Sequence, residues 1–368
     1  MRKGLWLAAV AACLAMVPMV GFAEDAESDG SGLLDRFIGP DAPVKFGGWV
    51  SAGYTSDEDG LFNTHKGVNV HQTWLYLERT TDGSEGLDIG GRFDVMHGVD
   101  GIDTQAFGNE RGEWDFRDSF DQGEYGFALP QLYVELAYDD FKVKAGHFYT
   151  LLGYEVVPAT GNFFFTHAFT MTKSEAFTHT GAVATYSGIE GVELYGGWTA
   201  GWDTGFDRYR GGNNFIGGVK YTPLDQLSMI YITTVGDLGW VGEGYAHSFV
   251  ATVTPIDKLT YVFQSDYVDT NGDVLGHDIS DDYNTVGINQ YLIYQVLDRV
   301  GVGTRMEWWK ASGTSYYGAT FGTNLKLLAN LVLRPEYRYQ WSPASDNGWG
   351  DGLPMNQSIF AVDAVVSF

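Results

Sequence analysis

Apolar and charged residues alternate with a period of two along many short segments of this chain, and few folds can accommodate that pattern. In residues 331–341, LVLRPEYRYQW, one face would carry Leu331, Leu333, Pro335, Tyr337, Tyr339 and Trp341, and the other Val332, Arg334, Glu336, Arg338 and Gln340. The same split appears in residues 87–95 and 299–309. Because successive side chains of a strand point to opposite faces, each segment predicts a β-strand with one face suited to lipid and the other to water.

Turn signals recur at regular intervals between such segments. The strings PLDQL, PIDKL, VLDRV and LANLV contain Asp225, Asp257, Asp298 and Asn330, which are spaced by 32, 41 and 32 residues. That spacing fits two strands and one connection, so the repeat unit is a β-hairpin. Extending it predicts about sixteen strands, near residues 43–54, 68–79, 87–97, 128–138, 141–150, 178–187, 191–202, 214–222, 227–236, 245–254, 259–268, 283–294, 299–310, 315–326, 331–341 and 356–368.

The connections between these strands alternate in length. Short turns such as residues 139–140 and 188–190 contrast with longer loops that include residues 98–127, 151–177, 269–282 and 342–355. Short turns at one rim and long loops at the other are typical of bacterial outer-membrane barrels. The sequence therefore predicts an all-β fold, a transmembrane antiparallel up-and-down β-barrel of about 16 strands, over residues 43–368.

A soluble β-sandwich or propeller is the competing fold, but its outward faces would be polar. Here the outward set is aliphatic, and aromatic residues gather near the expected strand ends, which favours interfacial girdles. This aromatic set comprises Trp49, Tyr54, Trp198, Trp202, Trp308, Trp309, Tyr337, Tyr339 and Trp341.

The first residues resemble an export signal. Arg2 and Lys3 precede an apolar run from Leu5 to Val20, and Gly21-Phe22-Ala23 forms a small-x-small cleavage site. We expect residues 1–23 to be removed and residues 24–42 to form a short N-terminal segment before the barrel. Cleavage would also remove Cys13, the one cysteine of the chain, which excludes disulfides from the mature protein.

The chain ends in an aromatic residue on an alternating strand. Residues 356–368, NQSIFAVDAVVSF, place Phe360, Val362, Ala364, Val366 and Phe368 on one face. We therefore predict that Phe368 is part of the C-terminal signal by which the barrel assembly machinery recognises the chain. With the export signal, it predicts an integral protein in contact with the lipid of a Gram-negative outer membrane.

The charge of the mature chain limits its partners. Without Arg2 and Lys3 it has 20 basic and 47 acidic side chains, yet the whole chain is 44% hydrophobic and 15% aromatic. Such an excess of acid disfavours nucleic acid as a partner, while the apolar content excludes a disordered chain.

Specific strings add a family resemblance. GHFYTLLGYEVVPATGNFFFTHAF (146–169), GINQYLIY (287–294) and RMEWWKASG (305–313) resemble the β-barrel porin family described as OmpL-like. The resemblance covers nearly the whole mature chain and implies an outer-membrane porin. It brings no defined substrate and no catalytic residues.

Strand parity places a set of charged side chains towards the barrel interior. A barrel of sixteen strands is too wide for wall side chains to fill, so these charges predict a water-filled pore for passive diffusion of small hydrophilic solutes or ions. The alternative is a non-conducting barrel with a surface adhesion or envelope-structural role. The predicted pore-lining residues are Glu78, Arg92, Asp94, Glu135, Lys142, Lys144, Arg305, Glu307, Arg334, Glu336, Arg338 and Asp363.

The loop at residues 151–177, between the fifth and sixth predicted strands, is too apolar to face water. It contains Tyr154, Phe163, Phe164 and Phe165, so it must bury itself either in the lumen or against a neighbouring subunit of a homo-oligomer, by default a trimer. By analogy with general porins we expect it to fold inward as a constriction loop. Glu155 would then be a constriction carboxylate, or would bond loop amides.

No catalytic, cofactor or metal site can be recognised in the sequence. The eight histidines form no HExxH pair, and neither a G-x-S-x-G motif nor a phosphate-binding glycine loop is present. DTNGD (269–273) begins like a calcium loop, but Val274 and Ser280 occupy the positions that need glycine and a bidentate glutamate. We therefore expect no enzymatic activity, no cofactor and no metal.

Overall fold

A computed structural model describes residues 43–58, 60–62, 65–108, 114–116, 120–271, 283–311, 313–344 and 356–368. The predicted signal peptide, the segment 24–42 and most of the DTNGD loop lie outside the described residues. None of the helices among the described residues has the length and apolar character needed to cross a membrane.

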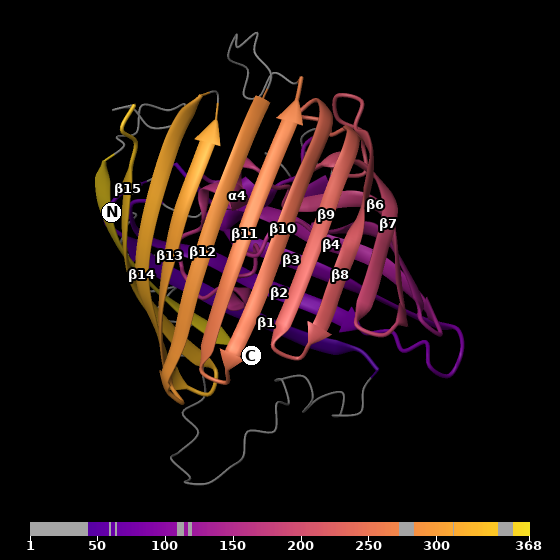
Figure 1. The fold of residues 1–368 in the computed structure, drawn as a ribbon, viewed down its shortest axis with the longest axis horizontal. Helices are drawn as coiled ribbons and strands as arrows, with labels where there is room; N and C mark the ends of the chain where they lie inside the picture. Colours follow the sequence, from indigo (N-terminus) through magenta and orange to yellow (C-terminus); the bar gives the residue numbers. More distant parts are fainter. Residues whose placement is uncertain are drawn as a thin grey trace. The chain divides into compact units, whose positions relative to one another are not determined.

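Sixteen antiparallel strands form a closed barrel in which each strand pairs with its neighbours along the chain and β1 pairs with β16 (Figure 1). This confirms the predicted fold class and strand number. The strands are β1 Lys45–Thr55, β2 Gly67–Arg79, β3 Asp88–Gly98, β4 Gly126–Tyr138, β5 Phe141–Tyr149, β6 Thr178–Ile189, β7 Val192–Trp202, β8 Asn213–Leu224, β9 Leu227–Asp237, β10 Glu243–Ile256, β11 Leu259–Thr270, β12 Tyr283–Leu297, β13 Val300–Ala311, β14 Thr314–Leu328, β15 Leu331–Trp341 and β16 Gln357–Ser367.

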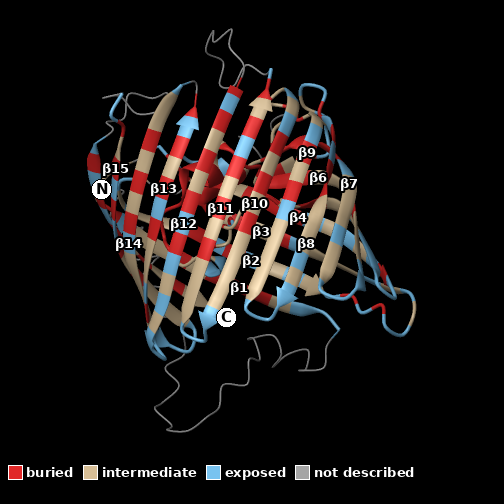
Figure 2. Ribbon diagram, viewed as in Figure 1, coloured by how far each residue is buried: buried red, intermediate tan, exposed pale blue. Residues whose placement is uncertain are grey.

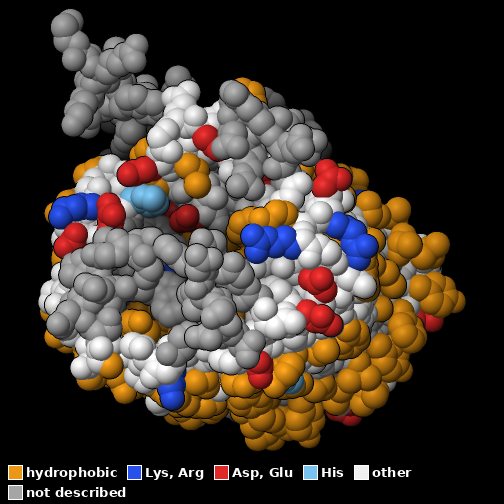
Figure 3. All heavy atoms as spheres, turned by 90° about the horizontal axis from the view of Figure 1, so that it is seen from above, with side chains coloured by type: hydrophobic (Ala, Val, Ile, Leu, Met, Phe, Trp, Pro, Cys, Tyr) orange, Lys and Arg blue, Asp and Glu red, His pale blue; other side chains and the backbone are white. Residues whose placement is uncertain are grey.

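Burial alternates along the strands as the sequence pattern predicts. On β4, Leu132, Val134 and Leu136 are exposed on the outside, whereas Gln131 is buried and donates a hydrogen bond to Asp94 inside the barrel. Figure 2 shows this alternation, with buried positions concentrated towards the end that carries the long loops. Figure 3 shows the barrel from that end: charged side chains lie on the rim, and hydrophobic side chains gather along the flank. The outer surface therefore matches a lipid-facing band.

Three tryptophans of the predicted aromatic girdle point into the barrel instead. Trp49, Trp202 and Trp309 are each less than 5% exposed. Trp49 stacks on Trp74 with ring centroids 4.6 Å apart. The prediction was wrong for these three residues because proximity to a strand end says nothing about which face a side chain takes. Trp198 of the same strand is 46% exposed, and an irregular register between Thr199 and Trp202 interrupts the alternation that would otherwise put both tryptophans on one face.

The chain terminus closes the ring. Trp49 pairs with Ser367 in the register of β1 and β16, and Phe368 exchanges backbone hydrogen bonds of 3.0 and 2.9 Å with Gly48. The terminal residue thus continues the ladder that joins first and last strands. Its role as an assembly signal stays a prediction.

Short helices occur in two of the long loops. The loop after β3 contains α3 Val99–Thr104 and the 3-10 turn η1 Trp114–Phe116. The loop after β5 contains η2 Ala159–Gly161 and α4 Phe169–Lys173, and α4 lies inside the ring of strands (Figure 1). The loop after β5 therefore enters the lumen of the barrel.

Candidate functional site

Residues 150–177, here called the inner loop, cross the interior of the barrel. At one side, Gln72 of β2 donates to the Val157 carbonyl (2.7 Å) and accepts from the Ala159 amide (2.9 Å). At the other side, the Gly153 amide donates to Ser248 of β10 (3.0 Å). Since β2 and β10 are eight places apart in the ring of sixteen, the loop spans the lumen from wall to wall.

Arg334 of β15 holds the middle of the inner loop. Its guanidinium forms two bonds with Asp363 of β16, at 2.8 and 2.6 Å. Its Nη1 donates to the carbonyl oxygens of Ala159 (2.8 Å), Asn162 (2.8 Å) and Phe164 (3.2 Å). One fully charged donor group therefore satisfies three loop carbonyls that have no strand partner.

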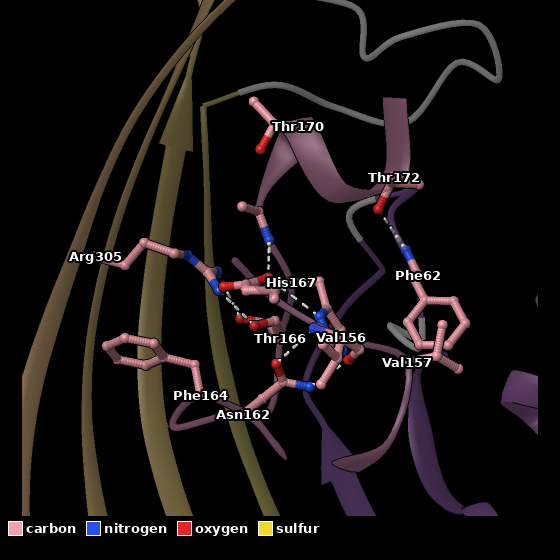
Figure 4. A network of polar contacts seen from close by, with 12 residues as sticks. Phe62, Val156, Val157, Asn162, Phe164, Thr166, His167, Thr170, Thr172 and Arg305 are labelled. Atoms are coloured by element: carbon pink, nitrogen blue, oxygen red, sulfur yellow. Dashed lines mark hydrogen bonds and ion pairs between the residues drawn. The ribbon is translucent and has the colours of Figure 1, made fainter. Parts of the chain in front are cut away.

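Arg305 of β13 binds the two ends of the same loop segment. It donates to Glu155 (2.7 Å) and to the Thr166 carbonyl (2.6 Å), and Figure 4 shows Arg305 pointing towards Thr166. Its Nε donates to Glu307 (2.8 Å). Arg338 of β15 shares Glu307 at 2.6 Å. Arg305, Glu307 and Arg338 are at most 5% exposed, so their charges are neutralised by each other and by the loop rather than by water.

The wall carboxylates bind loop amides in the same way. Glu336 accepts hydrogen bonds from the amides of Phe165 (2.8 Å) and Thr166 (3.0 Å), and Glu307 accepts from the Phe169 amide (2.8 Å). Six of the twelve charges expected on the inner face thus form one buried network with the loop: Arg305, Glu307, Arg334, Glu336, Arg338 and Asp363.

Aromatic side chains fix the loop against glycines of the wall. Phe163 lies over Gly301 and Gly303, where an added Cβ would approach its ring to 3.2 and 2.6 Å. Phe164 lies over Gly322 in the same manner, and Tyr154 packs against Tyr291 with centroids 4.8 Å apart. Glycine at these positions leaves room for rings that a larger residue would displace.

Phe165 is also fully buried, against His71 of β2, with ring centroids 4.7 Å apart. The residues expected in the constriction loop, Tyr154, Glu155, Phe163, Phe164 and Phe165, therefore all lie inside the barrel.

The other predicted pore-lining residues lie nearer the short turns and are less buried. Arg92 pairs with Asp94 (2.7 Å) and Glu78 (3.4 Å), and of these only Asp94 is fully buried. Lys144 Nζ lies 4.3 Å from the centre of the Tyr133 ring. Glu135 accepts a hydrogen bond from Thr81, and Lys142 donates to the Thr81 carbonyl at 3.3 Å. These six charged residues, Glu78, Arg92, Asp94, Glu135, Lys142 and Lys144, are here called the vestibule; they lie on the inner wall between the inner loop and the short turns.

Glu155 is an ionised carboxylate at the centre of the network. Burial opposes its ionisation, but attraction to Arg305 and the contacts with His167 and the Ala168 amide outweigh burial and lower its pKa from 4.5 to about 2. A native pKa below the unfolded value stabilises the fold above about pH 4.5, and this contribution is lost as the pH falls towards 2.

Replacement of Glu155 by glutamine tests this contribution. We expect Glu155→Gln to lose about 3 kcal/mol of stability at neutral pH, which is the free energy equivalent to the lowered pKa. Its unfolding midpoint in detergent should change less than that of the wild type between pH 5 and 2. Equal pH profiles for the two proteins would contradict the assignment.

Several residues of the site were not found by sequence reasoning. Gln72, His167 and Glu175 bond within the interior, as do Gln264 and Asp266 on β11. The period-two pattern of residues 259–268 could have placed Gln264 and Asp266 inward. For the loop residues no periodic signal exists. Among the described residues, no group of three or more His, Cys, Asp or Glu side chains that could hold a metal ion is found.

Comparison with known proteins places the chain in a family. The family described as "Putative beta-barrel porin-2, OmpL-like" matches residues 43–368. No curated protein matches the sequence.

Solved structures show the same fold. The anion-selective porin from Comamonas acidovorans has a TM-score of 0.60 at 15% identity, covering 88% of this chain and 99% of that chain. The trimer form of OmpT, an outer membrane protein of Vibrio cholerae, has a TM-score of 0.55 at 13% identity, with 88% and 99% covered. A mutant of the Rh. blastica porin has a TM-score of 0.55 at 16% identity, with 88% and 100% covered. The chain therefore belongs to the OmpL-like family of β-barrel porins and is, in general class, an outer-membrane porin.

Proposed function

We propose that the barrel is a passive diffusion channel for small hydrophilic solutes or ions, narrowed by the inner loop, with no enzymatic step. This proposal rests on one observation: the network of six wall charges holds the inner loop across the lumen. Bonds to these charges hold the loop in place and so keep the width of any passage constant. The vestibule below supplies both signs of charge, with Arg92 and Lys144 facing Glu78 and Glu135.

Planar bilayers provide the direct test. Purified protein should produce stepwise increases in conductance, and a folded barrel that produces none would contradict the proposal. The acidic excess of the chain favours a mild cation preference, measured as a reversal potential in a salt gradient. The buried arginines are already neutralised by carboxylates, so they contribute little to selectivity.

A non-conducting barrel with an adhesive or envelope-structural role is the second candidate. The observation that favours it is an apolar stretch of inner wall on β6 to β11. There Val183, Ile216, Ile232 and Val268 are buried and cluster with Leu152 of the inner loop. Water has no polar partner along such a surface, as expected if this side of the lumen is closed.

The assembly that we propose is a homo-oligomer, by default a trimer, inserted in outer-membrane lipid by the barrel assembly machinery. The trimer form of the similar Vibrio cholerae protein supports this state. Unheated samples should migrate as oligomers in detergent gels and as a single band of monomer after boiling. Sedimentation of the folded protein as a monomer would contradict it.

A further inference from the structure

A second cluster of polar side chains lies inside the barrel, where the end of the inner loop meets β11 and β12. The loop contributes Thr170 of α4 and Glu175, which follows α4. The wall contributes Gln264 and Asp266 from β11, and Asn289 from β12, which pairs with Gln264 in the strand register. Five oxygen-bearing side chains from three elements therefore converge on one place.

Hydrogen bonds define how close these groups are. The Nε2 atom of Gln264 lies 2.5 Å from Glu175 Oε1, 2.7 Å from Asp266 Oδ2 and 3.4 Å from Thr170 Oγ1. Asn289 Nδ2 donates to the same Thr170 hydroxyl at 2.6 Å. Because both carboxylates contact a single nitrogen atom, they are near neighbours.

The cluster is buried, and several of its oxygen atoms lack hydrogen bonds. Glu175 is 4% exposed, Gln264 and Asp266 are 1% exposed, and Thr170 and Asn289 are 0% exposed. Among the described residues, Asp266 Oδ1, Gln264 Oε1 and Asn289 Oδ1 are buried and have no hydrogen-bond partner. Two amide oxygens and one oxygen of Asp266 thus lack a donor in a cluster that also contains the Glu175 carboxylate, a cost that a bound cation would remove.

Among the described side chains, no basic group supplies that positive charge. Within the part of the chain that the structure describes, neither Glu175 nor Asp266 forms an ion pair with Lys, Arg or His, whereas Glu155, Glu307 and Asp363 each pair with an arginine. Two buried carboxylates without a counter-charge are costly. The contrast with the arginine network sets this cluster apart from the constriction site.

We propose that this cluster binds a calcium ion. The atoms that would coordinate the ion are all oxygen atoms, as a hard cation prefers, and the two carboxylates balance the charge of a divalent ion. The Thr170 hydroxyl and the carbonyl oxygens of Gln264 and Asn289, after rotation of both amides, would complete the ligand set. The oxygen and nitrogen of such an amide are interchangeable by rotation. Calcium accepts this flexible mixture of ligands more readily than magnesium, which retains water and demands octahedral geometry.

Such an ion would join the loop to the wall. Thr170 and Glu175 belong to the inner loop and the remaining three ligands belong to the barrel, so the bound ion would attach the end of the loop to β11 and β12, beside the arginine network. This site does not depend on whether the barrel conducts.

Calcium titration of the folded, chelator-treated full chain in detergent tests the proposal. Isothermal calorimetry at high salt, which suppresses loose binding by acidic loops, should detect one calcium site in the wild type. We expect Glu175→Gln and Asp266→Asn each to weaken it at least about tenfold, because ligand charge sets calcium affinity. Asp269→Asn is the matched control, since this β11 carboxylate lies on the opposite face and accepts from Tyr245 and Tyr267.

Thermal unfolding separates loss of binding from loss of folding. Calcium should raise the unfolding temperature of the wild type and of Asp269→Asn, but not of the two site variants. In chelator, Glu175→Gln should be at least as stable as the wild type, because it removes an uncompensated buried charge. Absence of binding by the wild type, or unchanged binding by Asp266→Asn, would overturn the proposal.

Discussion

Replacement of Arg305 by methionine should destabilise the folded barrel by about 3–5 kcal/mol, the cost of removing one partner from a buried ion pair. Methionine preserves much of the side-chain length but leaves Glu155 without its salt bridge and the Thr166 carbonyl without its donor. Glu307 would retain Arg338. Urea unfolding in detergent, followed by tryptophan fluorescence, measures the change.

Two variants make this experiment specific. Arg299→Met alters an exposed arginine in the turn before the same strand and should have almost no effect. The double variant Arg305→Met with Glu155→Gln removes the stranded charge and should recover part of the loss. If Arg305→Met behaved like Arg299→Met, the buried network would not be what holds the inner loop.

Deletion of residues 156–166 should raise single-channel conductance several-fold. The deletion removes the loop segment that Arg334 and Glu336 hold across the lumen, while the anchors Glu155 and His167 remain. A sixteen-stranded barrel without an internal loop leaves a wide aqueous lumen. Conductance steps in planar bilayers give the result.

The controls for this deletion are folding and a distant aromatic change. Heat-dependent gel mobility shows whether the shortened protein still forms a barrel. Phe120→Ser, which alters an exposed aromatic residue of the loop between β3 and β4, should leave conductance unchanged. Unchanged conductance of the deletion variant, together with dissociation of oligomers, would instead assign the loop to subunit contact.

Most of the fold could be predicted because a strand leaves a local trace. On β15 the alternation of residues 331–341 places Arg334, Glu336 and Arg338 on one face, and all three are buried inside the barrel. Strand limits were less certain: residues 315–326 extend to Thr314–Leu328, and α3 was not recognised within residues 98–127. A six-residue helix has too few turns to show a hydrophobic period.

The candidate site could be predicted only in its wall residues. Parity identifies which side chains of a strand face inward, but not what they meet there. Arg334 looks the same in sequence whether it lines water or binds three loop carbonyls. Likewise, Trp308 and Trp309 are adjacent, and only their side of β13 decides that Trp309 is buried.

By itself, the sequence determined a sixteen-stranded antiparallel barrel with an apolar exterior, charged inward positions and one loop too apolar for water. Each of these properties depends on neighbours within a few residues, so each leaves a pattern in the chain. Only the tertiary structure decided that Arg305, Arg334 and Glu336 bind this loop across the lumen, and that Glu175 meets Asp266. Those partners are separated by about ninety residues or more, and no local pattern records a contact between an aperiodic loop and a distant strand.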